Sequence, residues 1–377
     1  MTLFPVYSLY PINPVRGQGS YVYTEDGTEY LDFYGGHAVI SIGHAHPHYV
    51  KMISEQVAKL GFYSNSVENP LQLELADKLG RLSGMDDYQL FLVSSGAEAN
   101  ENALKLASFQ TGRSRVIAFR GGFHGRTSAA VNATDNEAIK APINRNYPVT
   151  FLDLNDLEAV RTELRKGDVA AVIIEGIQGV GGIHVPEADY LEALPDLCHE
   201  NGALLILDEV QSGYGRSGKF FAFQHSKVRP DIVTMAKGMG NGFPIGGVLI
   251  APEIEAKSGM LGTTFGGSHL ACAAGIAVLD VIEQEDLLAG TQVQGKYLMQ
   301  SLRETGLFTE VRGHGLMIGL QMEEGIAPLR KRLLFEHRVF TGSSKDPNTI
   351  RLLPPLNVTR TECERVVEAF QEALVTP

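Results

Sequence analysis

From Tyr88 to Ala251 the sequence alternates between short apolar runs and segments with a helical pattern. Apolar runs such as RVIAF, VAAVIIEG and ALLILDEV lack the alternation of polar and apolar residues expected of a half-exposed strand. Helical segments such as GAEANENALKLASFQTG and NDLEAVRTELRKG separate these runs. Unbroken apolar strands joined by helices are typical of a mostly parallel sheet that is buried on both faces, so we expect an α/β fold.

The segments on either side of this region have a different pattern. SYVYTEDGTEYLDF alternates around Asp26 and Gly27, which predicts a β-hairpin with a type I′ turn. Towards the C-terminus, one long helical pattern leads into strands within EVRGHGLMIGLQM and TIRLLPPLNV and a final helix, TECERVVEAFQEAL. A chain of 377 residues exceeds the usual size of one core. We expect a large domain at 43–275 and a small α+β domain at 276–377, which the N-terminal segment 1–42 joins.

Charge and composition exclude several classes of protein. The formal net charge is −12, which argues against nucleic acid or an anionic membrane as the main partner. The N-terminal sequence lacks the pattern of a signal peptide, and no apolar run approaches the length of a membrane span, so we expect a cytoplasmic protein. The cysteines, Cys198, Cys272 and Cys363, have no CxxC spacing, which indicates neither a disulfide framework nor a zinc site.

Residues that a pyridoxal cofactor requires occur near the ends of the predicted strands. Lys237, in DIVTMAKGMGNG, could form an imine with the aldehyde of the cofactor, and Asp208, in ILDEV, could protonate the ring nitrogen. Gly96 and Ala97 begin a helix whose free N–H groups could bind a phosphate, and Phe123 could form an aromatic wall. Each residue alone has an ordinary explanation, such as a solvated lysine or a serine-capped helix. Their combination favours a cofactor site.

Six motifs carry a resemblance to a known family. SSGAEANENALKLA, RGGFHGRT, ILDEVQSGYGRSG, AKGMGNGFPIGG, GTTFGGSHLA and VRGHGLMIG, in this order, resemble the class III aminotransferases, which depend on pyridoxal 5'-phosphate (PLP) and have PLP fold type I. The resemblance spans nearly the whole chain and is greatest to the acetylornithine and succinylornithine branch. It implies transfer of the δ-amino group of an N-acylornithine to 2-oxoglutarate, as in arginine biosynthesis, by a homodimer with shared active sites.

The resemblance also implies individual roles. Lys237 would bind the cofactor covalently and move the proton, while Asp208 would pair with the pyridinium nitrogen. Gln211 would contact the phenolic oxygen and Phe123 would stack on the ring. The cofactor phosphate would be bound by Gly96, Ala97 and, from the other subunit, Thr264.

Three further residues would bind substrate. By the same resemblance, Arg126 in FHGRT would hold the α-carboxylate of the acylated ornithine, Thr263 would line the pocket of the other subunit, and Arg351 in IRLLPPLN would hold the α-carboxylate of glutamate or 2-oxoglutarate. A guanidinium suits this task because it binds a carboxylate through two parallel hydrogen bonds.

One position departs from the family pattern. The family commonly has QGEGG, whose glutamate would neutralise the carboxylate-binding arginine, but this chain has QGVGG with Val180. Valine cannot form that ion pair. The means by which the δ-amine rather than an α-amine of the donor is selected is therefore open.

Other functions remain as alternatives. Ornithine δ-aminotransferase or another class III activity would share the same cofactor chemistry. The motif GHAHPHY, with His44, His46 and His48, superficially resembles a metal cluster, and with Asp208 and Glu209 it would suit a metal-dependent hydrolase. Pro47 disrupts a regular strand there, so we expect no metal.

Overall fold

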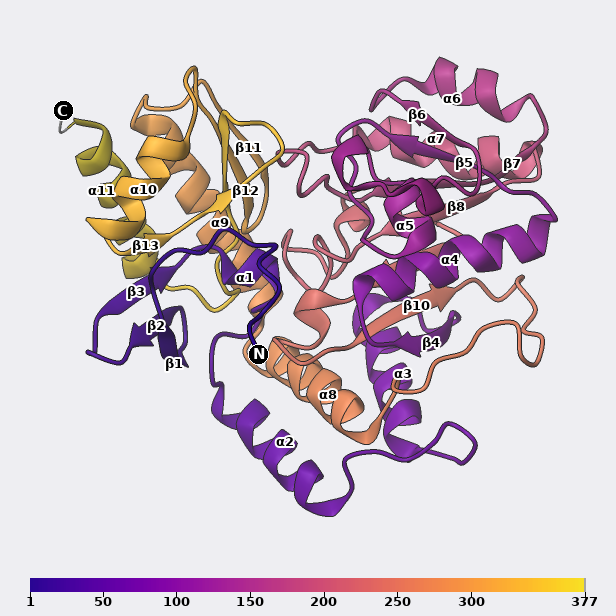
Figure 1. The fold of residues 1–377 in the computed structure, drawn as a ribbon, viewed down its shortest axis with the longest axis horizontal. Coiled ribbons are helices and arrows are strands. Elements are labelled where there is room, and N and C mark those ends of the chain that lie inside the picture. The colour runs from indigo at the N-terminus through magenta and orange to yellow at the C-terminus, as the bar shows by residue number, and fades with distance from the viewer. Residues whose placement is uncertain (376–377) are drawn as a thin grey trace.

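The computed structural model describes residues 1–375, and within them it contains three sheets (Figure 1). The central sheet has seven strands in the order β4, β10, β9, β8, β7, β5, β6. β10 is antiparallel to both of its neighbours, while β9, β8, β7, β5 and β6 run parallel. The expected α/β fold with a mostly parallel sheet is confirmed. The strands are β4 (Gln89–Val93), β5 (Arg115–Phe119), β6 (Val149–Leu152), β7 (Val169–Glu175), β8 (Leu204–Asp208), β9 (Ile232–Met235) and β10 (Gly246–Ile250).

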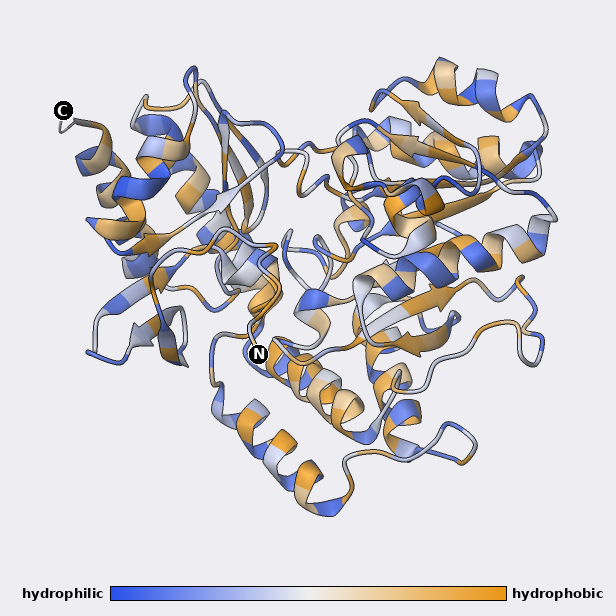
Figure 2. Ribbon diagram, viewed as in Figure 1, coloured by the Kyte–Doolittle hydropathy of each residue, from blue (hydrophilic) through white to orange (hydrophobic). Residues whose placement is uncertain are grey.

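Both faces of this sheet are buried, as the unbroken apolar runs predict. On β7, Ala171 and Ile173 pack in a core cluster with residues of α4, while Val172 and Ile174 pack in the opposite cluster with residues of α7 and α8. In Figure 2 these strands are mainly orange, the colour of hydrophobic residues, whereas α4 and α6 also carry blue, hydrophilic residues. The helices of this region are α2 (Pro47–Lys59), α3 (Pro70–Ser83), α4 (Gly96–Thr111), α5 (Ser128–Asn132), α6 (Leu157–Leu164), α7 (Ala188–Glu200) and α8 (His269–Gln284).

A second unit contains the other two sheets and lies on the left of Figure 1. Leu31 and Phe33 from the N-terminal segment join its core cluster with Leu298 and Phe370, and β3 pairs in parallel with β13. The N-terminal segment therefore packs with the C-terminal part of the chain; the expected domain boundaries stay a prediction. The elements of this unit are β1 (Pro14–Gln18), β2 (Tyr21–Thr24), β3 (Glu29–Asp32), α1 (Gly35–Ala38), α9 (Leu287–Glu304), β11 (Glu310–His314), β12 (Met317–Gln321), α10 (Ala327–Phe335), β13 (Val339–Phe340), β14 (Gly342–Ser343), β15 (Thr349–Leu352) and α11 (Arg360–Val375).

The hairpin predicted around Asp26 and Gly27 is present, but the type of turn differs. β2 and β3 pair antiparallel, and Gly27 has a φ of +83°. Asp26 does not have a positive φ, so the turn is not type I′. Instead its carboxylate accepts a hydrogen bond from the N–H of Thr28 at 3.1 Å, an Asx-type interaction that closes a longer loop.

The long helical pattern after Ser268 is two helices rather than one. α8 ends at Gln284 and α9 begins at Leu287, because Asp286 has a φ of +47°, which does not continue a regular right-handed α-helix. α8 is largely apolar because it is buried in the core of the large unit. Within residues 1–375, no helix is both long and apolar enough to cross a membrane.

Candidate active site

A cavity of about 370 Å³ lies where the parallel strands of the central sheet end. Its walls include Glu175 and Asp208, the last residues of β7 and β8, together with the turn after β9 and the start of α4. In α/β proteins, ligands bind at this edge because several strands deliver their following loops to one place. The volume is within the range of small-molecule sites.

Lys237 enters this cavity from a strained turn. The residue follows β9 by two positions and has a φ of +47°, a left-handed conformation that costs a residue with a side chain about 1 kcal/mol or more. Burial lowers the pKa of its amine to about 8, although the negative charge of Asp208 opposes this shift. Near neutral pH about a tenth of the amine is therefore unprotonated, far more than for an ordinary lysine, and only the unprotonated form is nucleophilic or basic.

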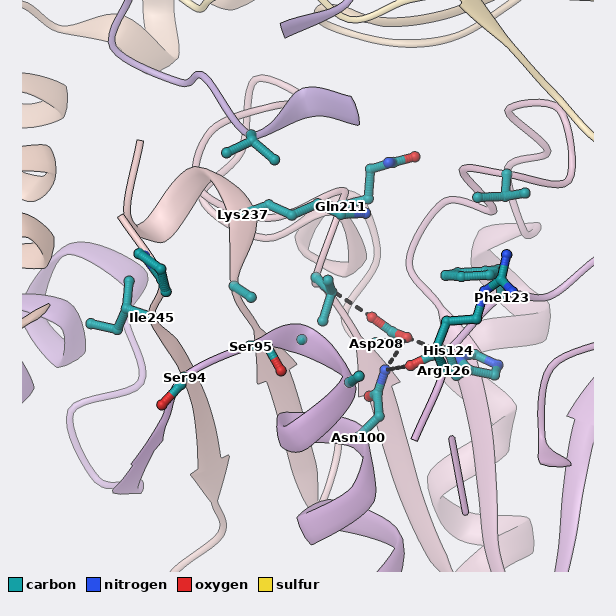
Figure 3. A pocket seen from close by; sticks show the side chains of 18 of the residues that line it. Ser94, Ser95, Asn100, Phe123, His124, Arg126, Asp208, Gln211, Lys237 and Ile245 are labelled. Carbon is teal, nitrogen blue, oxygen red and sulfur yellow. Dashed lines mark hydrogen bonds and ion pairs between the residues drawn. The ribbon is translucent and has the colours of Figure 1, made fainter. Parts of the chain in front are cut away.

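Asp208 is a buried carboxylate with fixed orientation (Figure 3). Its Oδ2 accepts hydrogen bonds from Nδ2 of Asn100 and interacts with Nδ1 of His124, both at 2.7 Å, and its Oδ1 accepts one from the N–H of Val210 at 2.9 Å. Thr234 in turn donates to Oδ1 of Asn100 at 2.6 Å. These partners fix the orientation of the carboxylate and leave further acceptor capacity for a ligand in the cavity.

The electrostatic environment of His124 is set by its carboxylate neighbours. Burial lowers the pKa of His124, but the hydrogen bond and charge of Asp208, with a further contribution from Glu175, raise it above its ordinary value overall. The imidazole is therefore biased towards its cationic form. A cation behind Asp208 stabilises the negative charge that this carboxylate would present to a ligand.

Glu175 links two loops that surround the cavity. Oε1 accepts a hydrogen bond from the N–H of Phe123 at 2.9 Å, and Oε2 accepts one from the N–H of Gly179 at 2.8 Å. Burial raises the pKa of this carboxyl group, and the charge of Asp208 raises it further, against the opposing effect of His124. Its position indicates that Glu175 holds these loops in place.

The start of α4 is suited to bind an anion. Ser95 caps the helix by accepting a hydrogen bond from the N–H of Glu98 at 3.2 Å, and Glu98 accepts one from the N–H of Ser94 at 2.6 Å. The first-turn N–H groups of Gly96 and Ala97 have no partner inside the helix, since first-turn amides never do. A side chain at position 96 would collide with Val210, which explains the glycine. The predicted serine cap and the phosphate site are thus compatible.

The FHGRT segment forms the opposite wall. Phe123 and Arg126 both line the cavity and lie close together in Figure 3. Arg126 is exposed, and among residues 1–375 no hydrogen bond or ion pair holds its guanidinium. An unpaired guanidinium on a cavity wall is available to a carboxylate ligand.

The cavity brings together most, but not all, of the residues that the sequence singles out. Three residues of the predicted site are not among the residues that line it: Thr263 is half-buried beside a separate cavity, Thr264 is exposed, and Arg351 is buried and bonded to Gln211. The roles of the individual residues stay predictions. The predicted residues that line the cavity are Gly96, Ala97, Phe123, Arg126, Asp208, Gln211 and Lys237.

The histidines of GHAHPHY are separated rather than clustered. His44 lies 2.9 Å from Asp32, His46 lies 2.8 Å from Glu285, and His48 lies 2.9 Å from Asp280. They surround the start of α2, so no strand brings them to one face. Within the described part of the chain, no group of three or more potential metal ligands is found.

Several residues of the site were not predicted from the sequence. Asn100, His124 and Glu175 hold Asp208 and its surrounding loops, and His37 accepts a hydrogen bond from Gln211 through its backbone carbonyl at 3.1 Å. His124 lies inside the FHGRT motif, and Glu175 ends an apolar run as Asp208 does. Polar residues at strand ends were the signal that could have found Glu175.

The residues present fit pyridoxal phosphate. An amine of lowered pKa, an oriented carboxylate, an aromatic wall and a free helix N-terminus are four separate requirements of this cofactor, and they surround one cavity. Lys237 would hold its aldehyde carbon, Asp208 its ring nitrogen, and the N–H groups of Gly96 and Ala97 its phosphate.

Comparisons with known proteins agree with this geometry. The family model for class III aminotransferases matches residues 5–374. Acetylornithine aminotransferase of Archaeoglobus fulgidus is 40% identical over 356 residues, covering 94% of this chain and 93% of that protein. The enzyme of the same name from Bacillus subtilis is 39% identical over 381 residues, covering 99% and 97%.

Solved structures show the same fold. Ornithine aminotransferase of Toxoplasma gondii superposes with a TM-score of 0.92 at 27% identity, over 99% of this chain and 92% of that one. A second structure of that enzyme, described as having partial occupancy of PLP at the active site, has a TM-score of 0.91 at the same identity and coverage. The chain belongs to the class III aminotransferases and is a transaminase of PLP fold type I that uses pyridoxal phosphate.

Proposed function

We propose that this enzyme transfers the δ-amino group of N-acetylornithine, or of N-succinylornithine, to 2-oxoglutarate in the cytoplasm, as a step of arginine biosynthesis. The names of the curated relatives support acetylornithine as donor, at 38–40% identity over nearly the whole chain. The observation that carries the proposal is the free guanidinium of Arg126 on the wall of the cavity that contains Lys237. An acylated ornithine bound there by its α-carboxylate has no free α-amine, so only its δ-amine can react.

The residues of the chain divide the work. When bound, pyridoxal phosphate supplies an aldehyde for attachment of the amine and a ring that accepts electrons from the substrate carbon. Asp208 would pair with the ring nitrogen, and His124 and Asn100 hold the carboxylate in the orientation that this contact needs. Nζ of Lys237, whose pKa burial lowers, would accept the proton released from the substrate carbon and later donate it.

A panel of amine donors tests the substrate. Initial rates with 2-oxoglutarate as acceptor should follow the order N-acetylornithine or N-succinylornithine, then free ornithine, with 4-aminobutyrate slowest. Free ornithine should react more slowly in this scheme, because its α-amine is not acylated and can compete with its δ-amine for the reacting position beside Lys237. A clear preference for free ornithine would overturn the choice of donor.

Ornithine δ-aminotransferase is the second candidate. The solved structures of that name superpose closely, with TM-scores up to 0.92, but at 27% identity they are more distant than the acetylornithine enzymes. The same panel separates the two activities.

We further propose a homodimer in which each subunit completes the site of the other. Thr264 is exposed and does not line the cavity of its own chain, so its expected contact with a cofactor phosphate requires a second copy. Large apolar side chains are exposed beside it, with Phe62 and Phe265 in contact at 5.3 Å between ring centroids. Exposed apolar patches of this kind mark interfaces. Other exposed apolar residues are Leu3, Phe4, Tyr7, Leu9, Tyr63 and Leu73.

Hybrid dimers test the shared site. Subunits with Lys237→Ala and subunits with Thr264→Glu, co-expressed with different tags, should each be inactive as homodimers. A one-to-one mixture should recover about a quarter of the wild-type activity, since half of the dimers are hybrids and each hybrid has one intact site. Absence of recovery in purified hybrids would contradict shared sites.

A further inference from the structure

Arg351 is a buried cation without a carboxylate partner. It lies on β15, and only 2% of its surface is exposed. Its Nε donates to the backbone carbonyl of Ser343 at 2.6 Å and its Nη1 donates to Oε1 of Gln211 at 3.1 Å. Among residues 1–375, no aspartate or glutamate forms an ion pair with it. Charges this deeply buried are normally paired, so a missing anion is the notable feature.

Gln211 separates this guanidinium from the cavity. Gln211 and Val180 both line the cavity, whereas Arg351 does not. The amide of Gln211 is held at both ends, because Nε2 donates to the carbonyl of His37 at 3.1 Å while Oε1 accepts from Arg351. A side chain at Gly179 would overlap Oε1 of Gln211, so the loop is shaped around the amide in this position.

The amide covers Arg351 without neutralising it. A glutamine carries no charge, and Val180 supplies none, so neither residue compensates the charge of the guanidinium. Against the larger effect of burial, the charge of Glu175 raises the pKa of Arg351, but this carboxylate bonds to the N–H groups of Phe123 and Gly179 rather than to the guanidinium. Burial lowers the pKa of Arg351, and its charge in turn contributes to the lowered pKa of Lys237. A hydrogen bond between a guanidinium and a carboxylate is roughly twice as strong as one to a neutral acceptor. An incoming carboxylate can therefore displace the amide, but an uncharged part of a substrate cannot.

We propose that Gln211 is a specificity-determining cover: it shields Arg351 while a substrate with one carboxylate occupies the cavity, and it turns away when a dicarboxylate brings a second carboxylate to the guanidinium. This inference rests on the proposed function with N-acetylornithine as the donor, which has one carboxylate, at Arg126, whereas the acceptor, 2-oxoglutarate, has two. The acetyl form of the donor is the clearest case, because its only carboxylate is the one at Arg126. Gln211 would thus cover Arg351 with a neutral side chain, where an acidic residue would cover it by forming an ion pair.

Binding of unreactive acids to the holoenzyme tests the proposal. Glutarate has two carboxylates and pentanoate, of the same length, has one, and their dissociation constants are measured by isothermal titration calorimetry at saturating cofactor. Gln211→Met removes the acceptor and uncovers Arg351, so glutarate should bind about tenfold more tightly. Gln211→Glu places a carboxylate against Arg351, so glutarate should bind about tenfold more weakly. Pentanoate should bind all three proteins alike.

Opposite changes in the two variants are the decisive result. A loss of cofactor contact at Gln211 would instead shift both variants, and both acids, in the same direction, and that outcome would overturn the proposal. So would unchanged glutarate binding in both variants while Arg351→Gln weakens it. No amine donor is present in these titrations, so their outcome is independent of the donor panel: a preference for free ornithine would overturn the proposed donor and leave the role of Gln211 standing.

Discussion

Nδ1 of His124 lies 2.7 Å from Oδ2 of Asp208, and both side chains are buried. The contact joins the loop after β5 to the end of β8 across 84 residues of sequence. Since Asn100 binds the same oxygen from α4, three separate elements determine the orientation of one carboxylate. This carboxylate is the one that we expect at the ring nitrogen of the cofactor, so we expect His124 to act as a positioning residue for it.

Removing the donor at position 124 should therefore weaken cofactor binding. His124→Leu is expected to raise the dissociation constant for pyridoxal phosphate about tenfold or more, because a buried charge-assisted hydrogen bond to Asp208 is lost. His124→Asn, whose amide nitrogen can occupy the position of Nδ1, should retain much of the affinity. Absorbance titration of cofactor-free protein measures both. Equal affinity of His124→Leu and wild type would contradict the positioning role.

The same contact predicts a dependence of stability on pH. Asp208 keeps the pKa of His124 above the ordinary value of 6.5 despite burial. Because this base has a higher pKa in the folded state than in the unfolded state, its charged form stabilises the folded protein. This stabilisation is complete below about pH 6.5 and is lost as the pH rises through the folded-state pKa. The difference in unfolding free energy between wild type and His124→Asn should thus narrow as the pH rises. Urea denaturation from pH 6 to pH 9 measures it, and a constant difference would argue against the cationic form.

Much of the architecture could be predicted from the sequence, for a local reason. The apolar run RVIAF coincides with β5, and the strand patterns ending at Asp208 and near Lys237 match β8 and β9, because burial on both faces leaves unbroken apolar runs. The helix break at Asp286 was not predicted, since nothing in the local periodicity announces a left-handed residue. The predicted turn type at Asp26 was wrong for a similar reason, because a hydrogen bond from the N–H of Thr28 to the side chain of Asp26 shapes the loop in place of a type I′ turn.

Of the site, too, the sequence predicts the local features and not the contacts between distant elements. Lys237, Asp208 and the start of α4 could be found because each follows a recognisable strand. The pairing of Arg351 with Gln211, at a separation of 140 residues, could not, since it depends on how β15 of the small unit faces a loop of the large one. Sequence motifs indicate which residues could react, whereas contacts between distant elements determine which of these residues, such as Arg351, are shielded from the cavity.

Lys237 should give a second pH dependence, of opposite sign, in cofactor-free protein. Burial lowers its pKa to about 8 from 10.5, so the folded state binds fewer protons than the unfolded state between these values. The penalty for burying the charge is fully present below about pH 8 and disappears as the pH rises to 10.5. Stability of wild type relative to Lys237→Met should therefore rise by about 3 kcal/mol over this range, since each pKa unit corresponds to roughly 1.4 kcal/mol.

Urea denaturation of the two cofactor-free proteins between pH 7 and pH 10.5 measures this difference, and shifts of other groups cancel in the comparison. Parallel profiles would show that the amine is not buried as described. As a functional control, Lys237→Met loaded with cofactor should give no mass adduct after borohydride reduction.

Arg126 is expected to determine the affinity for the donor carboxylate. Its guanidinium is exposed on the cavity wall and unpaired within residues 1–375, so Arg126→Gln removes a ligand-binding group without breaking an internal contact. In this variant kcat/KM for N-acetylornithine should fall about 10- to 100-fold, mainly because KM rises. Arg126→Lys should retain part of the affinity, because an ammonium group still attracts the carboxylate as a point charge. Steady-state kinetics measures kcat and KM, and the melting temperatures of the variants should equal that of wild type. A KM equal to that of wild type would reject this role.

Lys345 connects the small unit to the cavity loops of the large one. Its Nζ donates to Oδ2 of Asp135 at 2.8 Å, and the same oxygen accepts a hydrogen bond from the N–H of Gly121 at 2.8 Å. Its backbone N–H donates to the carbonyl of Val180, also at 2.8 Å. The backbone bond to Val180 survives any substitution of the side chain, whereas Lys345→Met removes both the ion pair and the hydrogen bond from Nζ to the carbonyl of Asp135 at 2.6 Å.

A double-mutant cycle with Asp135→Asn should give a coupling energy of about 0.5–1 kcal/mol, because the pair is partly exposed to solvent. Asp135→Asn alone should destabilise the protein more than Lys345→Met, since it also weakens the bond from Gly121, two residues before Phe123. That variant should in addition bind the cofactor less tightly, whereas Lys345→Met should not. Chemical denaturation and cofactor titration of the four proteins measure these terms. Zero coupling would mean that the two hydrogen bonds to backbone carbonyls, of Val180 and of Asp135, join Lys345 to this loop without a contribution from the ion pair.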